Sequence, residues 1–570
     1  MAGTPVLYPT LTPLDNPPIT DEFVSVNNGH LWLNGQRFVG FGVNIDSFAW
    51  VGVKSGNPPT YSANAVATMR AWLDNLVNMG VRVVRLHSWD ELTGGNIFSW
   101  FNDTTTRRFD GNTIDVLAWA FNECKVRNIR VIFTLHYLRQ LVVTNDVPDV
   151  PSPLFYESAT SNSPFYGTLS EMHPWFWYDT GLQWLQTEYI KNILTYVSKY
   201  SGLPLGQDPV LLSVTIQNET SLAKTIPYSY SPTKYPFMSA ALIANLQAWC
   251  IANGVNYNTM SALQHVQWAV ETETQVLQAE VAFARQYTPA LITAGTFYGN
   301  AQCGCIKTIY EAGDMVDFHM YAGTTPNQFL VDITNPTNTI RTSFSALCAA
   351  CNLGKPTLCT EWAPVGNNAR NPDSDRSKVM AAVVGAAVQQ DVDMLFLYSY
   401  MHATVNNNPG FWNPGLWDFI DDALFLKSVR TQIAKFHDVD LRPTSVTMMP
   451  FTPAKYYGYN SGSNFIQPLI PYEDPDILSV PQTTCIQMFM IETYWATGSG
   501  GAVASGQVAQ DWWIGGLLGS GQANVYKGSD GTTGTPAVNG GILAGGVANL
   551  PSIEPAGGGA LASGTDVQGL

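Results

Sequence analysis

Two glutamates follow apolar runs of the sequence, in positions where a carboxylate can do chemistry. Val210 to Ile216 leads into the tripeptide Gln-Asn-Glu that ends at Glu219, and Pro356 to Thr360 leads into Glu361. A short buried run that ends in polar side chains is typical of an interior parallel strand opening at its C-terminal edge. In an α/β barrel that edge carries the catalytic residues. Glu219 alone fits a solvated loop residue equally well, so the rest of the chain must decide.

The two glutamates end the fourth and seventh predicted strands, so their carboxyls would face each other across a barrel mouth. Glycoside hydrolysis uses such a pair, about 5–5.5 Å apart for retention and about 6.5–9.5 Å apart for inversion. Arg85 would keep Glu361 ionised and the Tyr321 hydroxyl would orient it, which favours Glu361 as the nucleophile. Glu219, with fewer cationic neighbours, would stay protonated and act as the acid and then the base.

Other polar side chains also gather at the C-terminal ends of the predicted strands. Any one of the histidines fits a structural role equally well, but their number at one rim favours a site. The set comprises Asn44, Asp46, Arg85, His87, Asp90, His136, Asn218, His319, Tyr321, Tyr398, Tyr400 and His402.

The elements that must position these side chains alternate between strand and helix. Strands are predicted over 37–44, 81–86, 130–135, 210–216, 290–296, 315–320, 356–360 and 394–398. Helices are predicted over 65–79, 114–127, 181–200, 238–252, 260–287 and 421–436. Repeated βα units imply a parallel sheet, and eight of them predict an α/β fold of the (β/α)8 TIM-barrel type. A doubly wound open sheet is the rival, but no GxGxxG follows any predicted strand.

The barrel unit is predicted to span residues 23–438, after an extended arm over 1–22. Phe23 to Leu33 alternates around Asn27-Asn28-Gly29, which predicts a hairpin that caps the closed end of the barrel. Residues 439–497 are predicted to form a β-rich module, and residues 498–570 form a Gly/Ala/Ser-rich tail. Such a tail cannot bury enough apolar area to order alone, so we expect self-assembly or particle association to order it.

Composition limits the class of partner. The chain has 570 residues, 13% of them charged, and a net charge of -16. Without a basic patch, phosphate backbones and anionic membranes are poor partners, so no nucleic acid is expected. The 17 Trp and 25 Tyr supply flat faces of the kind that pack on sugar rings. A neutral polysaccharide or oligosaccharide is the favoured ligand.

The eight cysteines are scattered and form no disulfide framework. Cys303 with Cys305, and Cys348 with Cys351, have spacings that would suit zinc, but the second pair also fits small buried residues in an Ala-rich helix. One disulfide somewhere in the chain is left open. We expect no metal and no cofactor.

The first residues, MAGTPVLYPTLTP, lack the basic and apolar regions of a Sec signal peptide. No apolar run approaches the roughly 20 residues that span a bilayer. The localisation is left unknown: the protein either stays inside the cell or leaves by another route, such as a particle released by lysis.

Six segments together resemble the clan A glycoside hydrolases, in particular the family-five cellulase and β-mannanase group. They are LNGQRFVGFGVN, VRVVRLHSWD, VIFTLH, DPVLLSVTIQNE, FHMY and PTLCTEW, within about residues 31–400. The resemblance implies that Glu219 is the acid/base and Glu361 the nucleophile. It also implies that Asn218 bonds the sugar 2-OH, that Arg85 and Tyr321 support Glu361, and that His136 and His319 line subsite −1.

The sequence departs from the family at strand eight, where a Trp usually forms the floor of subsite −1. Here the segment reads LFLYSYMH, so Tyr398 or Tyr400, or else Trp412 or Trp417, must serve. Sugar platforms are predicted among the rim aromatics, although each would equally fit loop packing. They are Trp89, Trp175, Phe176, Trp177, Trp362 and Trp412. Trp89, Asp90, Trp362 and Tyr400 complete the predicted substrate-binding residues.

The leading hypothesis is a retaining hydrolase of a β-linked polysaccharide such as mannan, glucan or a surface glycan. The alternative is a glycan-binding structural or adhesive protein of a virion or other assembly, with activity lost or reduced. A particle-borne depolymerase would satisfy both. A metal-dependent barrel hydrolase lacks support, because Val43-Asn44-Ile45 offers no HxH ligand pair at strand one.

Overall fold

The computed structural model describes most of the barrel region and short segments beyond it. The described residues are 16–46, 50, 54–55, 60–61, 63–87, 89–90, 111–136, 140–141, 170–171, 176–219, 222, 236–260, 262–298, 306–322, 351, 353–364, 373–401, 423–443, 458–459, 466–467, 486–487, 492–496, 507–511 and 516–517.

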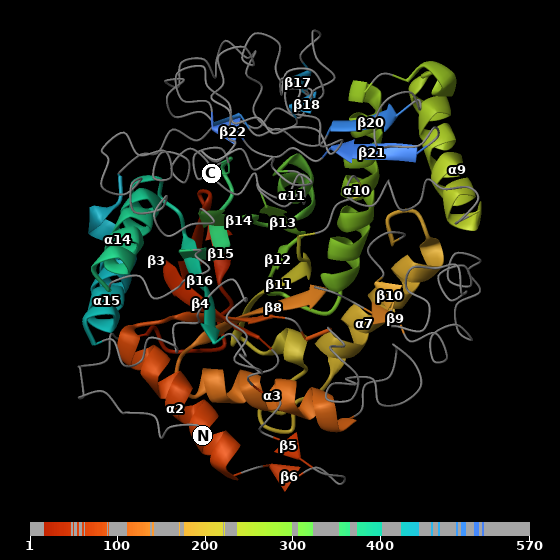
Figure 1. The fold of residues 1–570 in the computed structure, drawn as a ribbon. Helices are drawn as coiled ribbons and strands as arrows, with labels where there is room; N and C mark the ends of the chain where they lie inside the picture. Colours follow the sequence, from red (N-terminus) through yellow and green to blue (C-terminus); the bar gives the residue numbers. More distant parts are fainter. Residues whose placement is uncertain are drawn as a thin grey trace.

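One parallel sheet organises the chain (Figure 1). Its strands run in the order β12-β11-β8-β7-β4-β16-β15-β14-β13, and every neighbouring pair is parallel. Their bounds are β4 (Gly40–Asp46), β7 (Val83–His87), β8 (Arg130–His136), β11 (Leu211–Gln217), β12 (Leu291–Thr293), β13 (Thr296–Tyr298), β14 (Val316–Ala322), β15 (Thr357–Pro364) and β16 (Met394–Met401).

The fifth predicted strand is divided between β12 and β13, which lie at the two ends of this order. β12 pairs with β11, and β13 pairs with β14. Only Ala294 and Gly295 separate the halves, and the Gln217 amide donates to the Ala294 carbonyl at 3.3 Å. The two ends of the ladder therefore meet, and the sheet is a nearly closed eight-stranded barrel. The barrel prediction is confirmed, and the open doubly wound sheet is excluded.

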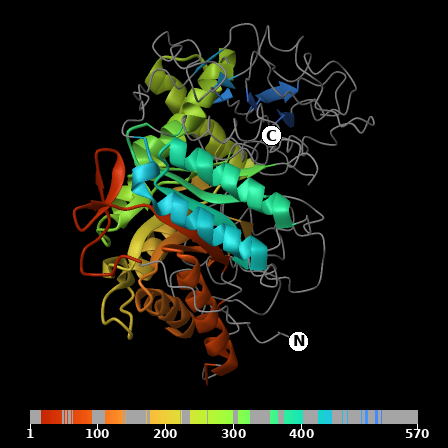
Figure 2. The same cartoon turned by 90° about the vertical axis from the view of Figure 1, so that its left-hand side faces the viewer.

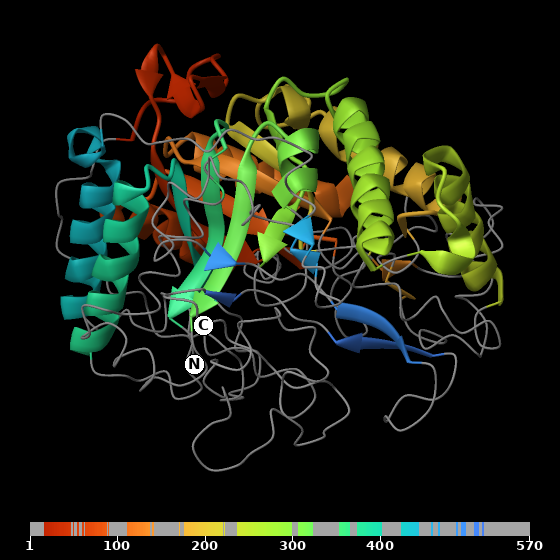
Figure 3. The ribbon, with the colours of Figure 1, turned by 90° about the horizontal axis from the view of Figure 1, so that it is seen from above.

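Helices cover the outside of this barrel (Figures 2 and 3). Their apolar faces and the outward faces of the strands bury one continuous core, which includes Leu73, Phe121, Ile190 and Val384. The helices are α2 (Ala63–Met79), α3 (Gly111–Lys125), α7 (Thr180–Thr195), α9 (Pro236–Asn253), α10 (Ala262–Ala284), α11 (Ile306–Ala312), α14 (Asp373–Gln389) and α15 (Ala423–His437). Short 3-10 turns follow at η2 (Leu205–Gln207), η3 (Tyr257–Thr259) and η5 (Val439–Leu441).

Helix α7 ends earlier than the sequence predicted. The predicted helix ran to residue 200, but Thr195 is the last helical residue and Tyr196 has an extended backbone. A turn follows, in which the Ser198 amide donates to the Leu203 carbonyl at 2.9 Å and Gly202 has a φ of 72°. The positive φ is the left-handed conformation that glycine adopts without strain, so the turn replaces the last helical residues.

A small antiparallel sheet closes the N-terminal end of the barrel. It contains β1 (Ser25–Asn27), β2 (His30–Leu33) and β3 (Gln36–Arg37). Its turns, Asn28-Gly29 and Asn34-Gly35, have positive φ at both residues, which is the type I′ signature of tight hairpins. Leu31, Leu33 and Phe38 form one buried cluster with residues that begin the strands: Val83, Ile132, Leu212, Leu291, Met315, Leu358 and Met394. The predicted capping hairpin is confirmed.

Charged side chains brace this closed end. Arg37 Nη2 lies 2.7 Å from Asp391 Oδ1 and 3.2 Å from Asp393 Oδ1. His30 Nδ1 lies 3.3 Å from Asp393 Oδ1. Arg442 Nη1 donates to Asp391 Oδ1 at 3.2 Å and to the Val392 carbonyl at 2.7 Å. The hairpin sheet and the segment after α15 are thus tied to the turn that precedes β16.

Paired short strands occupy parts of the long connections and of the C-terminal region. They are β5 (Lys54–Ser55), β6 (Thr60–Tyr61), β9 (Gln140–Leu141), β10 (Ser170–Glu171), β17 (Gly458–Tyr459), β18 (Ile466–Gln467), β19 (Ile486–Gln487), β20 (Glu492–Ala496), β21 (Gln507–Asp511) and β22 (Gly516–Leu517). Arg442, which follows η5, donates a hydrogen bond to the Val392 carbonyl of the barrel. The predicted domain boundaries stay predictions. Among the described helices, none has the length and apolarity to span a membrane.

Candidate active site

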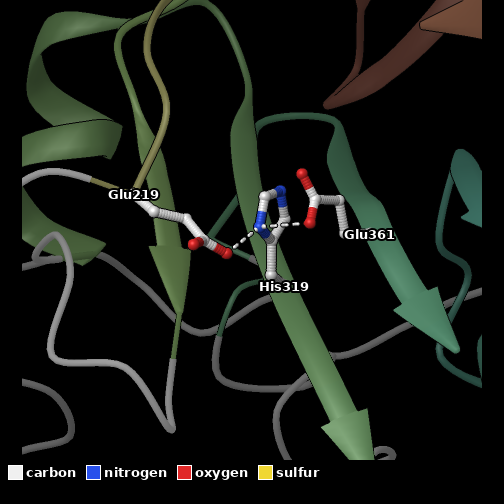
Figure 4. Close-up of side chains that lie close together, drawn as sticks. All are labelled: Glu219, His319 and Glu361. Carbon is white, nitrogen blue, oxygen red and sulfur yellow. Dashed lines mark hydrogen bonds and ion pairs between the residues drawn. The ribbon is translucent and has the colours of Figure 1, made fainter. Parts of the chain in front are cut away.

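The side chains of Glu219, His319 and Glu361 come together from β11, β14 and β15 (Figure 4). Glu219 follows β11, His319 lies on β14, and Glu361 lies on β15. One side-chain oxygen of each glutamate and a ring nitrogen of His319 all lie within 4.8 Å of one another. Two residues far apart in the sequence therefore place their carboxyls at one point of the rim.

Glu361 is held by the guanidinium of Arg85. Arg85 Nη1 lies 2.5 Å from Glu361 Oε1 and donates to the amide oxygen of Asn44 at 3.0 Å, and Arg85 Nη2 donates to the amide oxygen of Asn218 at 2.6 Å. Burial lowers the pKa of Arg85, but Glu361 and then Asp317 outweigh this, so its pKa is raised overall. Glu361 therefore contacts a permanent positive charge.

Glu219 has a different environment. Its Oε1 lies 2.5 Å from His319 Nδ1, and 21% of its side chain is exposed. Its φ of 39° is in the left-handed region, which is uncommon for a residue with a side chain. Backbone strain of this kind gathers at functional sites, where the surrounding structure imposes it. The two glutamates thus differ: Glu361 is buried on a cation, whereas Glu219 reaches solvent and contacts an imidazole.

His319 joins the two glutamates to a buried polar group below them. Its Nδ1 lies 3.5 Å from Glu361 Oε2, and its Nε2 lies 2.9 Å from Thr360 Oγ1. Burial lowers the pKa of His319 to about 3, against the opposing charge of Glu361, and Arg85 lowers it further. His319 is therefore a neutral imidazole with one N–H. Asp317, two residues earlier on β14, accepts from Thr360 Oγ1 at 2.7 Å.

A β-bulge in β15 explains how Thr360 and Glu361 both reach His319. Phe318 pairs with Cys359 and His319 pairs with Glu361, so Thr360 is an extra residue in β15. Successive side chains of a regular strand point to opposite faces. A bulge re-aims them. Because of it, two consecutive residues of β15 contact the same imidazole.

Two further histidines of the rim are buried. His87 Nε2 lies 3.8 Å from Glu361 Oε1, and burial holds the pKa of His87 well below its usual value. His136 Nδ1 lies 3.8 Å from Asp90 Oδ2, and its ring centroid is 4.9 Å from that of Tyr189. The ring of His136 therefore packs toward α7, and its predicted place in subsite −1 stays a prediction.

The rim tryptophans that the structure describes are buried, whereas a sugar platform must expose one face of its ring. Trp89 is 2% exposed and its ring lies 6.4 Å from that of Trp50 and 6.5 Å from that of Phe133. Trp362 is 3% exposed. Phe176 and Trp177 are also buried, and their rings pack together. This burial argues for the loop-packing alternative, because a platform must offer an open face.

Several predicted residues lie outside the described part of the structure. Tyr321 and Tyr400 lie on β14 and β16, but only their backbone is described. Trp175, His402, Trp412 and Trp417 lie outside the described residues, as do Cys303, Cys305 and Cys348. Their predicted roles stay predictions. Among the described cysteines, Cys124, Cys250 and Cys351 have free thiols, and Cys359 Sγ lies 3.5 Å from the Glu361 carbonyl oxygen.

Sequence reasoning missed Asp317 and Thr360. Asp317 is fully buried, and burial raises its pKa to about 7 although Arg85 lowers it. The signal for Asp317 was available, because an acidic residue two positions before His319 in a buried strand must share its face. Thr360 gave no signal, because a bulge leaves no mark in this sequence.

Glu219, His319 and Glu361 also offer three ligand atoms close enough for a metal ion. A cation at this point would share Glu361 with Arg85, whose guanidinium lies 2.5 Å from the same carboxylate. Repulsion between the two positive charges in a buried site disfavours this arrangement. The donor set therefore suits proton chemistry better than metal binding.

No protein-family model matches this sequence, and no curated protein matches it either. Among solved structures, the fold is similar to the endo-1,4-β-mannanase of Rhizomucor miehei, with 13% identity, a TM-score of 0.45, and coverage of 73% of this chain and 99% of that one. It is similar to the endo-β-1,4-mannanase of Thermotoga petrophila, with 13% identity, a TM-score of 0.43, and coverage of 71% and 78%. A family 5 glycoside hydrolase mannosidase from Rhizomucor miehei is similar at 13% identity and a TM-score of 0.46, with coverage of 73% and 97%. The chain is thus structurally similar to family 5 β-mannanases and mannosidases, at low sequence identity.

Proposed function

We propose that the protein is a retaining glycoside hydrolase that cleaves a β-linked polysaccharide by double displacement. One observation carries the proposal: Glu219 and Glu361 present oxygens within 4.8 Å of each other, and Arg85 contacts Glu361. Retaining enzymes keep their carboxyls close, whereas inverting enzymes leave room for a water between them. The short separation therefore supports retention.

In the first step Glu361 attacks the anomeric carbon. Its carboxylate, the nucleophile, is held in place by the Arg85 guanidinium. Glu219 gives its proton to the leaving oxygen as the anomeric bond breaks, so that a glycosyl ester forms on Glu361 and the leaving sugar departs with its hydroxyl. The partial exposure of Glu219 suits this role, because the leaving group must reach it.

In the second step the ionised Glu219 removes a proton from water, and the resulting hydroxyl attacks the same carbon. The ester bond breaks, Glu361 regains its charge beside Arg85, and the sugar leaves with its original anomeric configuration. We assign to Asn218 a hydrogen bond to the sugar 2-OH through its amide nitrogen, because its amide oxygen accepts from Arg85. The substrate class is a neutral β-glycan, with mannan tested first because the sequence motifs resemble β-mannanases.

The test measures reducing-sugar release from mannan, glucan and bacterial surface glycans. We expect turnover by the wild type, and losses of about 10³-fold or more in Glu361→Ala and Glu219→Gln. Glu188→Gln is the matched control, because Glu188 lies on α7 in an exposed pair with Lys191. NMR of the fresh product should show the β anomer first, which distinguishes retention from inversion.

Binding without turnover would contradict this proposal. If calorimetry detects binding of a glycan while wild type releases no sugar from the whole panel, the glycan-binding structural or adhesive role replaces it. Association with a particle that acts on extracellular glycan stays a prediction in either case.

A further inference from the structure

A chain of hydrogen bonds runs from the acid/base candidate to a carboxyl buried beneath it. Glu219 contacts His319 Nδ1, His319 Nε2 contacts Thr360 Oγ1, and Thr360 Oγ1 contacts Asp317 Oδ2. Asp317 is fully buried, so it is separated from any glycan at the rim. The chain therefore connects Glu219 to a carboxyl that takes no direct part in the reaction.

Such a chain has a direction, because each middle member donates one hydrogen and accepts another. A neutral histidine has one N–H, and a threonine hydroxyl has one O–H. If Thr360 donates to Asp317, then His319 Nε2–H donates to Thr360, and Nδ1 is left to accept from a protonated Glu219. If Asp317 is protonated and donates to Thr360, every bond reverses, and Nδ1–H donates to an ionised Glu219.

The surroundings of Asp317 favour the first direction near neutral pH and above. The Thr360 backbone amide, which can only donate, reaches Asp317 Oδ1 at 3.1 Å. The Thr296 hydroxyl lies 3.2 Å from Asp317 Oδ2. The positive charge of Arg85 also lowers the pKa of Asp317, against the burial that raises it to about 7. An ionised Asp317 has donors for both oxygens, so it fixes the orientation of Thr360.

We propose that Asp317 and Thr360 are positioning residues that decide, through His319, which carboxyl carries a proton shared between Glu219 and Asp317. With Asp317 ionised, the chain holds the proton on Glu219, where the first step of the proposed reaction needs it. This inference rests on the proposed function for its catalytic consequence, whereas the hydrogen-bond chain can be tested without turnover.

Reversal of the chain conserves protons. The Glu219 O–H bond breaks as His319 Nδ1–H forms, His319 Nε2–H breaks as a new Thr360 O–H forms, and the old Thr360 O–H breaks as Asp317 O–H forms. Glu219 becomes a carboxylate and Asp317 becomes neutral. The total charge is unchanged, and no other reactant is needed.

The other titratable groups that face the chain, in the described structure, do not compete for this proton. Arg85 stays charged, and His87 stays neutral because burial lowers its pKa. Glu361 is held by Arg85. Burial, and then Asp317, raise the pKa of the Cys351 thiol well above its usual value. The two ends, Glu219 and Asp317, are therefore the groups that share it.

Asp317→Asn tests the direction directly. An asparagine can accept the Thr360 amide through its oxygen and donate to Thr360 Oγ1 through its nitrogen, so it imitates the protonated aspartate. We expect His319 to carry its hydrogen on Nε2 in the wild type at pH 8 and on Nδ1 in Asp317→Asn. The measurement is ¹⁵N NMR of histidine-labelled protein, and His319→Gln assigns the signal among the eight histidines.

The catalytic readout separates proton delivery from general damage. In Asp317→Asn, kcat on an unactivated glycan should fall about 10²-fold, the size of a general-acid contribution. On a nitrophenyl glycoside, whose leaving group needs no proton, kcat should fall far less. The basic limb of the kcat/KM profile should move to lower pH by about one unit. A merely structural defect would lower kcat on both substrates by a similar factor and would leave the basic limb of the kcat/KM profile at the same pH.

Thr360→Val removes the middle of the chain, and Thr360→Ser restores it. Thr215→Val is the matched control: Thr215 is a buried threonine of β11 whose hydroxyl has no hydrogen-bond partner within the described residues. In the Thr360→Val background, Asp317→Asn should no longer change the His319 tautomer. Persistence of the change there would overturn the chain.

The outcomes also distinguish this inference from the proposed function. A tautomer switch in a protein without turnover would refute the glycosidase and leave the chain intact. Turnover by the wild type with no switch in Asp317→Asn, and with an unchanged basic limb, would refute the chain and leave the glycosidase intact.

Discussion

The two ends of the barrel both bury charged groups, but they arrange them differently. At the closed end, Arg37 and Arg442 contact Asp391 and, in the case of Arg37, also Asp393. At the open end, Arg85 is shared with two amide oxygens, and Glu219 reaches solvent. The closed end uses its ion pairs to fix the cap, whereas the open end leaves carboxyls in unlike environments. General acid–base catalysis requires two carboxyls in such different environments, because one must donate a proton while the other stays ionised.

The largest effect should follow from removing the open-end cation. Arg85→Met leaves Glu361 buried without its counter-charge, which should cost about 3–5 kcal/mol of unfolding free energy. It should also lower kcat/KM by about 10³-fold, the scale of losing one preorganised electrostatic contact. Urea denaturation and glycan hydrolysis measure the two effects.

Arg82→Met is the control for this variant. Arg82 lies three residues earlier, its Nη1 donates to the Val39 carbonyl, and burial lowers its pKa to about 10. Losses in Arg82→Met as large as those in Arg85→Met would show that the open-end arginine has no special role.

The next effect concerns pH and the buried acid of the open end. The folded pKa of Asp317 is about 7, above its unfolded value of about 3.9, so the folded protein binds the extra proton between these values. This group therefore contributes stability that is fully present below about pH 4 and lost as the pH rises to about 7. The slope is at most about 1.4 kcal/mol per pH unit.

Asp317→Asn should remove the pH dependence that Asp317 contributes. The difference in unfolding free energy between wild type and variant therefore measures the contribution of Asp317 alone. In urea titrations, we expect the unfolding free energy of the variant to rise steadily relative to that of the wild type from pH 4 to pH 7. A constant difference across this range would mean that Asp317 does not titrate there.

The smallest effect should come from the closed end. Arg37→Met removes hydrogen bonds to Asp391 and Asp393, and charged hydrogen bonds of this kind contribute on the order of 2 kcal/mol. Catalytic parameters should stay at the wild-type level, because the cap lies at the opposite end of the strands from Glu219 and Glu361. A large fall in kcat with little loss of stability in Arg37→Met would contradict the view that the closed end only stabilises the barrel.

The barrel and its main carboxyl pair could be predicted because their signals are local. Apolar runs gave the eight strands, and Asn28-Gly29 gave the hairpin turn, since glycine and asparagine tolerate a positive φ. Glu219 and Glu361 followed from their places after two such runs. Each of these features needs only a few neighbouring residues to be recognised.

The features that could not be predicted depend on contacts between distant segments. The Thr360 bulge is defined by the register of β15 against β14, and the left-handed backbone of Glu219 is imposed by its surroundings. The burial of Trp89 depends on Trp50 and Phe133. A tryptophan at a rim has the same sequence signature whether it packs a loop or binds a sugar, so only the structure could distinguish them.

The division of the fifth strand has a consequence for how the barrel fluctuates. β12 and β13 are three residues each; β12 pairs with β11 and β13 with β14, and in the described residues β12 is joined to the β14 side by the Asp314 amide, which donates to the Ile292 carbonyl. Local opening begins where the fewest backbone bonds must break. We expect local opening of the barrel at this divided strand, the seam between β11 and β14. Gln217, bonded across the seam to Ala294, lies two residues before Glu219. We therefore expect the least stable part of the barrel to lie next to the acid/base candidate, where a substrate that contacts both Glu219 and Glu361 would stabilise it.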